Sequence, residues 1–266
     1  MGNLLHHASI PLRCLGNMTR PVDTQKLQFY MTIPSPCPYL PGRMERKIFA
    51  QLDPITGPYL NNYLTHSGFR RSQNVLYRPA CESCQACRSL RVDTARFVPT
   101  KSMKRTLSRN RDLSSTICPA MATDEQFDLL TRYLQTRHHG GGMSDMDYSR
   151  YEMMVEECAA ETEIIEYRNQ DGKLIAAILV DVLMDGYSLV YSFFDPSESH
   201  RSLGHYMILD HIKRCKDEEH PWLYLGYWVK ESPKMEYKSK YKPCQILGVY
   251  GWQDIGHEDQ RTEDEA

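Results

Sequence analysis

Residues 162–196 read TEIIEYRNQDGKLIAAILVDVLMDGYSLVYSFFDP, and this stretch decides the fold. Its β-branched and aromatic residues predict three strands, at Thr162–Arg168, Lys173–Met184 and Tyr187–Phe194. An Asp-Gly pair stands in each of the two turns, and such a pair between β-rich runs is a strong signal for a β-hairpin. The stretch therefore predicts an antiparallel three-stranded meander.

The segment after the meander predicts a helix, Leu203–Lys216, and a fourth strand, Trp222–Trp228. Three strands, a helix and a further strand follow each other in this order in the core of GNAT acyltransferases. We therefore expect an α+β fold, although a fold of this kind does not by itself define a function.

Three further helices are predicted upstream of the meander. The first is Arg43–Leu52, which has apolar residues at helical spacing, and the second is a short helix at Asn61–Ser67. The third is Thr123–His139, which begins with a capping box in which Thr123 is the N-cap and Gln126 reaches back to it.

The composition is that of a globular protein, with 41% hydrophobic and 25% charged residues in a chain of 266. It excludes a disordered, collagen-like or disulfide-knotted chain. No run approaches the ~18–20 apolar residues of a membrane span, and the first twenty residues lack the apolar core of a secretory signal. We expect a cytoplasmic protein, whose nine cysteines are reduced thiols or metal ligands rather than disulfides.

Charge is divided unevenly along the chain. Residues 1–118 hold 17 Lys and Arg against 6 Asp and Glu, a net charge of +11. Residues 119–266 hold 15 against 28, a net charge of -13. A basic half of this kind suggests a polyanion partner, although runs of charge also form ordinary solvated faces.

Two segments carry cations in patterns that suit nucleic acid. Lys101, Lys104 and Arg105 share one face if their segment is a helix, and an anion would relieve their mutual repulsion. Lys238 and Lys240 alternate with tyrosines, and lysines interleaved with aromatic rings suit phosphates and stacked bases. The alternative for both segments is a solvated surface with extended lysine side chains.

Four cysteines form a candidate metal site. Cys81, Cys84 and Cys87 are spaced C-x2-C-x2-C, which lets thiolates converge on one ion or cluster. Cys37 stands in a proline-rich turn and supplies a fourth ligand if the two loops meet. The set predicts zinc or an iron–sulfur cluster, and the alternative is four free thiols in turns.

Four blocks of the sequence together resemble one protein family. They read CPYLPGR (37–43), YRPACESCQACRSLRV (77–92), YSFFDPSESHRSLGHYMILDHI (191–212) and YLGYWV with ESPKMEYKSKYKPC (224–229 and 231–244). In this order they are similar to the arginyl-tRNA–protein transferases, and most to the bacterial branch that transfers leucine. One position departs from the family: eukaryotic relatives, reported to hold an iron–sulfur cluster, have a second cysteine three residues after the position of Cys37, where this chain has Leu40.

The resemblance implies an N-terminal cysteine-bearing domain and a C-terminal GNAT-like domain. It also implies transfer of leucine from leucyl-tRNA to the α-amine of proteins that begin with Asp or Glu, which marks them for degradation by an N-degron pathway. We expect these domains at 26–118 and 119–253, between a flexible extension at 1–25 and a disordered acidic tail at 254–266.

This reaction assigns roles to residues in the matching blocks. The donor is an activated ester, so placing the amine beside it matters more than a strong base, and no cofactor is expected for the chemistry. Asp195 is the candidate for orienting the incoming ammonium, with Tyr191 and Tyr227 as further catalytic candidates. The candidates for binding the acidic side chain of the acceptor are Arg43, Arg78 and Arg88. The expected tRNA contacts are Lys101, Lys104, Arg105, Arg201, Gly204, Tyr206, Lys238 and Lys240.

The loop at 201–206 distinguishes this reaction from acetyl transfer. GNAT enzymes carry Arg/Gln-x-x-Gly-x-Gly/Ala there, where backbone N–H groups hold the pyrophosphate of coenzyme A. Arg201 and Gly204 fit, but the ring of Tyr206 obstructs that approach. This ring either stacks on a base near the tRNA 3′ end or packs into the core. Transfer of arginine, coenzyme-A-dependent N-acetyl transfer and non-catalytic RNA binding stay open as alternatives.

Overall fold

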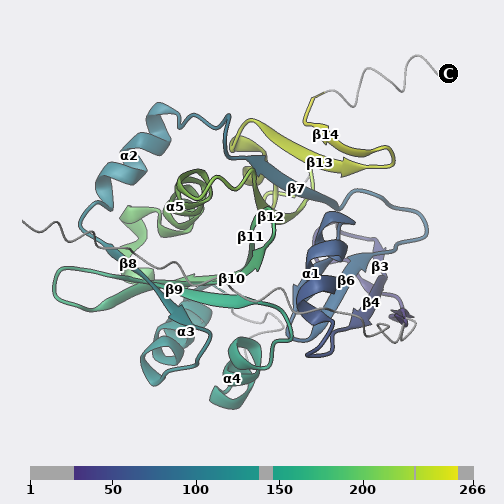
Figure 1. The fold of residues 1–266 in the computed structure, drawn as a ribbon, viewed down its shortest axis with the longest axis horizontal. Coiled ribbons are helices and arrows are strands. Elements are labelled where there is room, and N and C mark those ends of the chain that lie inside the picture. The colour runs from purple at the N-terminus through teal and green to yellow at the C-terminus, as the bar shows by residue number, and fades with distance from the viewer. Residues whose placement is uncertain (1–26, 138–145, 231, 257–266) are drawn as a thin grey trace, which may run out of the picture.

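The computed structural model describes residues 27–137, 146–230 and 232–256. Over these residues the chain forms a four-stranded antiparallel sheet, a short two-stranded hairpin and an eight-stranded mixed sheet (Figure 1). The α+β class expected from the sequence is confirmed.

The four-stranded sheet and α1 (Gly57–His66) lie together at one end of the molecule (Figure 1). The strand order is β1 (Tyr30–Met31), β4 (Lys47–Gln51), β6 (Val75–Pro79) and β5 (Arg70–Ser72). The hairpin joins β2 (Ser35–Pro36) to β3 (Met44–Glu45). Leu52, Leu64 and Leu76 form the centre of the small core beneath this sheet.

The predicted helix at residues 43–52 is wrong, because this segment contributes β3 and β4. The apolar side chains of Ile48 and Leu52 fit a helical period, but β4 pairs with β1 on one side and with β6 on the other. The ring of Phe49 also stacks on Tyr30 across the strands at 5.6 Å between centroids. These pairings with distant segments override the weak local signal.

The eight-stranded sheet draws its strands from both halves of the sequence. Its order is β14 (Gly251–Asp254), β13 (Cys244–Gly248), β7 (Arg88–Asp93), β12 (Trp222–Trp228), β11 (Gly186–Phe194), β10 (Leu174–Leu183), β9 (Thr162–Arg168) and β8 (Ser114–Pro119). The inner strand β7 comes from residues that precede the division expected at residue 118, and the edge strand β8 crosses that division. The division into domains at 26–118 and 119–253 stays a prediction.

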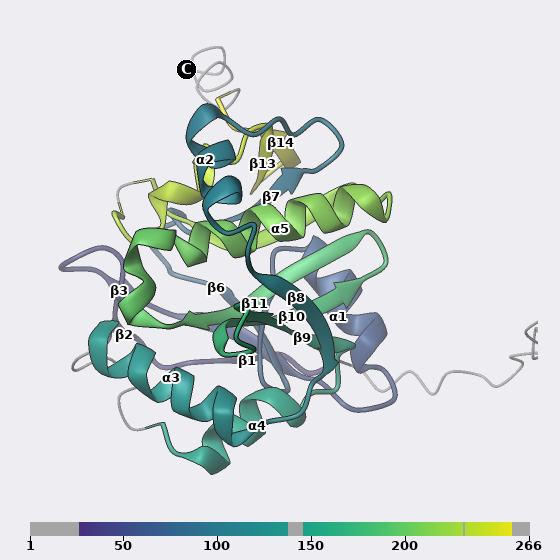
Figure 2. The same ribbon diagram turned by 90° about the vertical axis from the view of Figure 1, so that its left-hand side faces the viewer.

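Helices cover both faces of this sheet (Figure 2). On one face lie α3 (Asp124–Arg137) and α4 (Tyr148–Glu156), packed on the inner strands through one buried cluster. On the other face lie α5 (Leu203–Asp217) and α2 (Lys101–Arg109), in a second, larger cluster. Two 3-10 turns, η1 (Pro196–Arg201) and η2 (Glu236–Lys240), border the strands. None of the helices in the described ranges has the length and apolar character that crossing a membrane requires.

The predicted meander is confirmed, as β9, β10 and β11 pair antiparallel in chain order. The predicted helix and fourth strand are confirmed as α5 and β12, and β12 returns parallel to β11. This is the GNAT order expected from the sequence.

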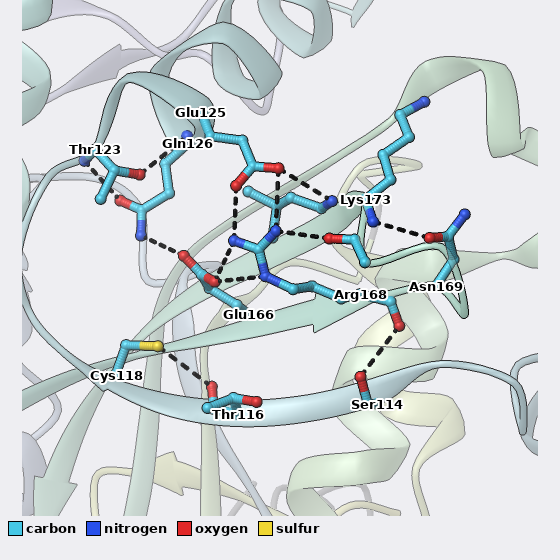
Figure 3. Close-up of polar contacts among 12 residues, drawn as sticks. Ser114, Thr116, Cys118, Thr123, Glu125, Gln126, Glu166, Arg168, Asn169 and Lys173 are labelled. Atoms are coloured by element: carbon cyan, nitrogen blue, oxygen red, sulfur yellow. Dashed lines mark hydrogen bonds and ion pairs between the residues drawn. The ribbon is translucent and has the colours of Figure 1, made fainter.

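The predicted capping box of α3 is also confirmed, and it helps to attach the helix to the sheet (Figure 3). Gln126 N donates to Thr123 Oγ1 at 3.3 Å, and Thr123 N donates to Gln126 Oε1 at 3.2 Å. The amide of Gln126 then donates to Glu166 on β9 at 2.8 Å. Arg168, also on β9, contacts both Glu125 and Glu166 at 2.7 Å, so the start of α3 is held on the sheet through charged groups.

A buried ion pair joins the two sheets. Arg71 on β5 contacts Asp181 on β10 at 2.7 Å, and both side chains are 1% exposed. Asn61 on α1 donates to the same carboxylate at 3.1 Å. His66, at the end of α1, contacts Asp185 in the β10–β11 turn at 2.8 Å. These contacts hold β5 and α1 against the β10–β11 hairpin of the large sheet.

Candidate active site

Strands β11 and β12 separate in the middle of the large sheet. They pair over only three positions, from Gly186 with Trp222 to Ser188 with Tyr224. Each strand has an irregularity just beyond that point: the register of β11 against β10 shifts around Val190, and that of β12 against β7 shifts before Gly226. Such bulges bend and twist a strand. The facing edges beyond these bulges are therefore open to side chains or to a substrate.

Arg70 occupies this gap. Its Nη2 donates a hydrogen bond to the carbonyl of Leu189 on β11. On the opposite strand, Gly226 has a φ of +78°, and a Cβ there would overlap the guanidinium of Arg70. Glycine is needed at position 226 both for the backbone conformation and for the close approach of this cation.

Lys238 enters the same gap from η2. Its Nζ donates to the carbonyl of Tyr227 on β12 at 2.7 Å, and the residue is only 9% exposed. Burial, with a contribution from the charge of Arg70, lowers the pKa of Lys238 to about 7. The tRNA contact expected for Lys238 stays a prediction, and its ammonium lies in the interior against a backbone carbonyl. Lys240, two residues further along, is exposed.

A cavity of about 400 Å³ adjoins the gap, between the small sheet and the strands β7, β12 and β13. The three arginines expected to bind the acceptor, Arg43, Arg78 and Arg88, all line it. Lys47 and Glu45 also line it, and they pair with each other at 2.8 Å. The cavity wall therefore has an excess of positive charge.

Tyr227 belongs to both the cavity and the gap. Its ring lines the cavity, and its hydroxyl lies 3.0 Å from the carbonyl of Gly68 and 2.9 Å from that of Tyr77. Burial raises the pKa of Tyr227 far above its ordinary value, so the phenol remains a hydrogen-bond donor at neutral pH. The backbone carbonyl of the same residue accepts the bond from Lys238.

The four candidate cysteine ligands all line the same cavity, namely Cys37, Cys81, Cys84 and Cys87. Burial and the three neighbouring thiols raise the pKa of Cys87 to about 12, and the Sγ of Cys84 accepts a bond from Arg43 at 3.2 Å. Within the described ranges, however, no three Cys, His, Asp or Glu side chains are grouped so that they could hold a metal ion. These thiols therefore do not fit the expected zinc or iron–sulfur cluster as they are arranged here.

Two of the catalytic candidates lie elsewhere. Asp195 caps η1 through Ser197 N at 3.0 Å and pairs with Lys173 at 2.8 Å. Burial acts to raise its pKa, but the hydrogen bonds from Lys173 and Ser197 outweigh burial and lower the pKa to about 2. Tyr191 packs with Phe193 in the cluster beneath α3 and α4, and its hydroxyl has no hydrogen-bond partner among the described residues. Neither residue lies with Tyr227 at the cavity, and their catalytic roles stay predictions.

The helix face expected to contact tRNA is present in α2. Lys101, Lys104 and Arg105 are exposed on it, while its apolar side chains, Met103 and Leu107, pack toward α5. The role of the three cations stays a prediction.

The loop before α5 is held by ion pairs. Arg201 forms a two-pronged pair with Asp112, at 2.8 and 2.9 Å, and a second pair with Glu198 at 2.7 Å. Gly204 lies in the first turn of α5. Tyr206 is 8% exposed and contacts Tyr167 edge to face. Its ring therefore packs into the core, which is one of the two alternatives predicted for it from the sequence.

The sequence interpretation missed Arg70 and the burial of Lys238. One signal was available, because an isolated glycine in a strand such as Gly226 often marks the close approach of another group. It also missed His205 in the first turn of α5, whose Nδ1 lies 2.6 Å from the hydroxyl of Tyr241. Its ring contacts Tyr237 edge to face, and this contact connects the start of α5 to η2.

Comparisons with known proteins agree across both halves of the chain. Residues 35–105 match the family model described as arginine-tRNA-protein transferase, N terminus, and residues 125–248 match the corresponding C terminus. A protein of Maricaulis maris (strain MCS10) named aspartate/glutamate leucyltransferase is 51% identical over 251 residues, covering 93% of this chain and 99% of that protein. A protein of the same name from Caulobacter vibrioides (strain NA1000 / CB15N) is 50% identical, covering 88% and 86%.

Among solved structures the similarity is much weaker. The crystal structure of FemX has a TM-score of 0.40 and 9% identity, covering 68% of this chain and 62% of that one. The structure of L-PGS from Bacillus licheniformis has a TM-score of 0.44 and 9% identity, covering 55% and 46%.

Proposed function

The chain belongs to the arginine-tRNA-protein transferase family, and from this premise we propose that it transfers leucine from leucyl-tRNA to the N-terminal α-amine of proteins that begin with Asp or Glu. The new N-terminal leucine marks such proteins for degradation. An aminoacyl-tRNA substrate places the reaction in the cytoplasm.

The positively charged cavity beside the β11–β12 gap carries this proposal. An Asp or Glu side chain fits its size of about 400 Å³, and Arg43, Arg78 and Arg88 supply the cations that a carboxylate needs. With the side chain in the cavity, the α-amine of the acceptor lies toward Tyr227 and the open gap.

The donor approaches the gap from the opposite side. The first turn of α5 favours negative charge, and the exposed cations of α2 lie on the neighbouring helix (Figure 2). We assign tRNA phosphates to Lys101, Lys104 and Arg105, with Lys240 as a further contact. The amine and the ester then meet between β11 and β12.

This arrangement needs no strong base. An α-amine has a pKa of about 7.7–8.0, so a fair fraction is neutral at pH 7 and able to attack the ester carbon. The protein accelerates the step by holding the two groups together and by stabilising the charge that develops on the carbonyl oxygen.

The test is transfer of labelled amino acid from charged tRNAs to peptides that differ only in residue one. We expect leucine to be transferred from leucyl-tRNA to Asp and Glu peptides, and not to Ala or Lys peptides. An arginyl-tRNA arm tests the transfer of arginine instead, and an arm with acetyl-coenzyme A tests acetylation. Equal use of the Ala peptide would contradict the proposal.

A substitution in the cavity wall tests whether the cavity binds the acidic side chain of the acceptor. Arg78→Gln removes one cation from the wall, and we expect the KM for the Asp peptide to rise about 10- to 100-fold because a charge-assisted contact to the carboxylate is lost. The matched control is Lys213→Gln, which removes an exposed cation near the C-terminal end of α5 and should leave this KM unchanged.

A further inference from the structure

The two walls of the β11–β12 gap each carry a cation. Arg70 contacts the carbonyl of Leu189 on β11, and Lys238 contacts the carbonyl of Tyr227 on β12. The two charges are close enough for Arg70 to disfavour the protonated form of Lys238. Each cation binds a backbone oxygen of the strand edge where the pairing between the strands has stopped.

Neither cation has a counter-charge in the described ranges. Among the described residues, Arg70 and Lys238 form no ion pair with a carboxylate, and the hydrogen bonds that hold them end on neutral carbonyl groups. Burying a charge without a partner is costly. In contrast, Arg71, the neighbour of Arg70 in sequence, is fully paired with Asp181. The gap is therefore a place where a small anion would bind favourably.

We propose that Arg70 and Lys238 form an anion site in the gap, and that its occupant is the ester carbonyl oxygen of the aminoacyl-tRNA as it takes up negative charge. This assignment rests on the function proposed above. The acceptor carboxylate has its own cations in the cavity, from Arg43, Arg78 and Arg88. The gap lies beyond Tyr227, where the amine and the ester meet.

An anion that exists only during the reaction also explains why no carboxylate in the part of the chain that the structure describes pairs with these cations. A permanent counter-charge would cancel the field that the developing oxyanion needs. Donors fixed in advance around the position where charge appears are the arrangement that stabilises a transition state more than the bound substrate.

The step balances without any further reactant. The amine nitrogen forms a bond to the carbonyl carbon, and the π-electron pair moves to the carbonyl oxygen, which becomes the oxyanion between the two cations. When the carbonyl re-forms, the bond from carbon to the ribose oxygen breaks. The proton lost from nitrogen ends on that ribose oxygen, so the products are a peptide bond and a tRNA hydroxyl.

Two substitutions remove the charge while keeping a hydrogen-bond donor, namely Arg70→Gln and Lys238→Gln. We expect each to lower kcat by about 10²- to 10³-fold, with the KM values for leucyl-tRNA and for the Asp peptide within about threefold of the native values. Lys234→Gln, an exposed lysine just before η2, is the matched control and should leave both parameters unchanged. Thermal unfolding confirms that each variant is folded.

An equilibrium measurement tests the same site without turnover. The probe is a Leu-Asp peptide in which a phosphonamidate group, a tetrahedral anion, replaces the Leu–Asp peptide bond, compared by calorimetry with the ordinary Leu-Asp peptide. We expect the native protein to bind the phosphonamidate at least tenfold more tightly, and both charge-removing variants to lose this preference.

Three results would overturn the assignment. One is native kcat in both variants, and another is equal binding of the two peptides by the native protein. The third is a raised KM for the Asp peptide with unchanged kcat in Arg70→Gln, which would place Arg70 in the acceptor site. Absence of any transfer by the native chain would instead contradict the proposed function itself.

Discussion

The ammonium of Lys238 is buried without a counter-charge among the described residues, and this burial affects stability as well as chemistry. The pKa of Lys238 is about 7 in the folded protein, against an ordinary value of 10.5. The unfolded chain therefore binds a proton at this side chain more readily than the folded chain does. The free energy of unfolding rises with pH between about 7 and 10.5, and below pH 7 the protonated lysine is destabilising throughout.

We predict that Lys238→Met is more stable than the native protein at pH 6.5. The substitution removes a buried, uncompensated charge and keeps an unbranched apolar side chain, and we expect a gain of about 1–3 kcal/mol in the free energy of unfolding. Urea unfolding at pH 6.5 and pH 9.5 checks it, and the gain should be smaller at the higher pH. A variant less stable than the native protein at pH 6.5 would contradict this account.

Which side chains meet at the site could be predicted only in part. Arg43, Arg78 and Arg88 were found through the family resemblance, and the cavity unites them. The place of Arg70 could not be found in this way, because it depends on contact with Leu189, 119 residues away in the sequence. The burial of Lys238 depends likewise on how η2 folds against β12, which no local pattern records.

Among the secondary-structure elements, those with strong local signals were predicted well. The meander has Asp-Gly turns between β-rich runs, and α3 has a capping box, so local chemistry was sufficient. Strand β4 was predicted as a helix because its apolar spacing is ambiguous and its pairing partners are distant in sequence. The loop at 201–206 could be recognised from its similarity to the GNAT motif. The ion pair between Arg201 and Asp112 could not be predicted, because Asp112 lies far away in the sequence.

The basic face of α2 is predicted to bind tRNA phosphates. A triple variant of this face should bind leucyl-tRNA more weakly than the native protein, and its binding should depend less on salt. The variant combines Lys101→Ala, Lys104→Ala and Arg105→Ala. Each lost phosphate contact reduces the slope of log K against log salt by roughly 0.7–0.9. Fluorescence anisotropy with labelled tRNA over a range of salt concentrations measures this slope.

Two lysines near the C-terminal end of α5, Lys213 and Lys216, provide a control for this helix. Their replacement by alanine should leave the slope unchanged. If the triple variant of α2 kept the native affinity and slope, the face would be an ordinary solvated surface.

In the whole molecule, the buried pair of Arg71 and Asp181 couples the small sheet to the large one. We predict that Arg71→Met destabilises the protein by about 3–5 kcal/mol, because Asp181 is left as a buried charge without its partner. The double variant Arg71→Met with Asp181→Leu should regain much of that loss. Denaturant unfolding of the native protein, the two single variants and the double variant measures the coupling. Equal stability of Arg71→Met and the double variant would show that the unpaired charge of Asp181 is not the cause of the loss.

The position of β7 between β12 and β13 also bears on how the chain folds as it is synthesised. Residues 88–93 leave the ribosome more than 100 residues before their partners at 222–228 and 244–248. Strand β7 therefore cannot pair with β12 and β13 until those later segments have emerged, and the nascent chain carries an unpaired strand until then. Such late, long-range pairing slows folding and leaves strand edges open to wrong partners, so this architecture places a demand on the chaperones that meet the chain.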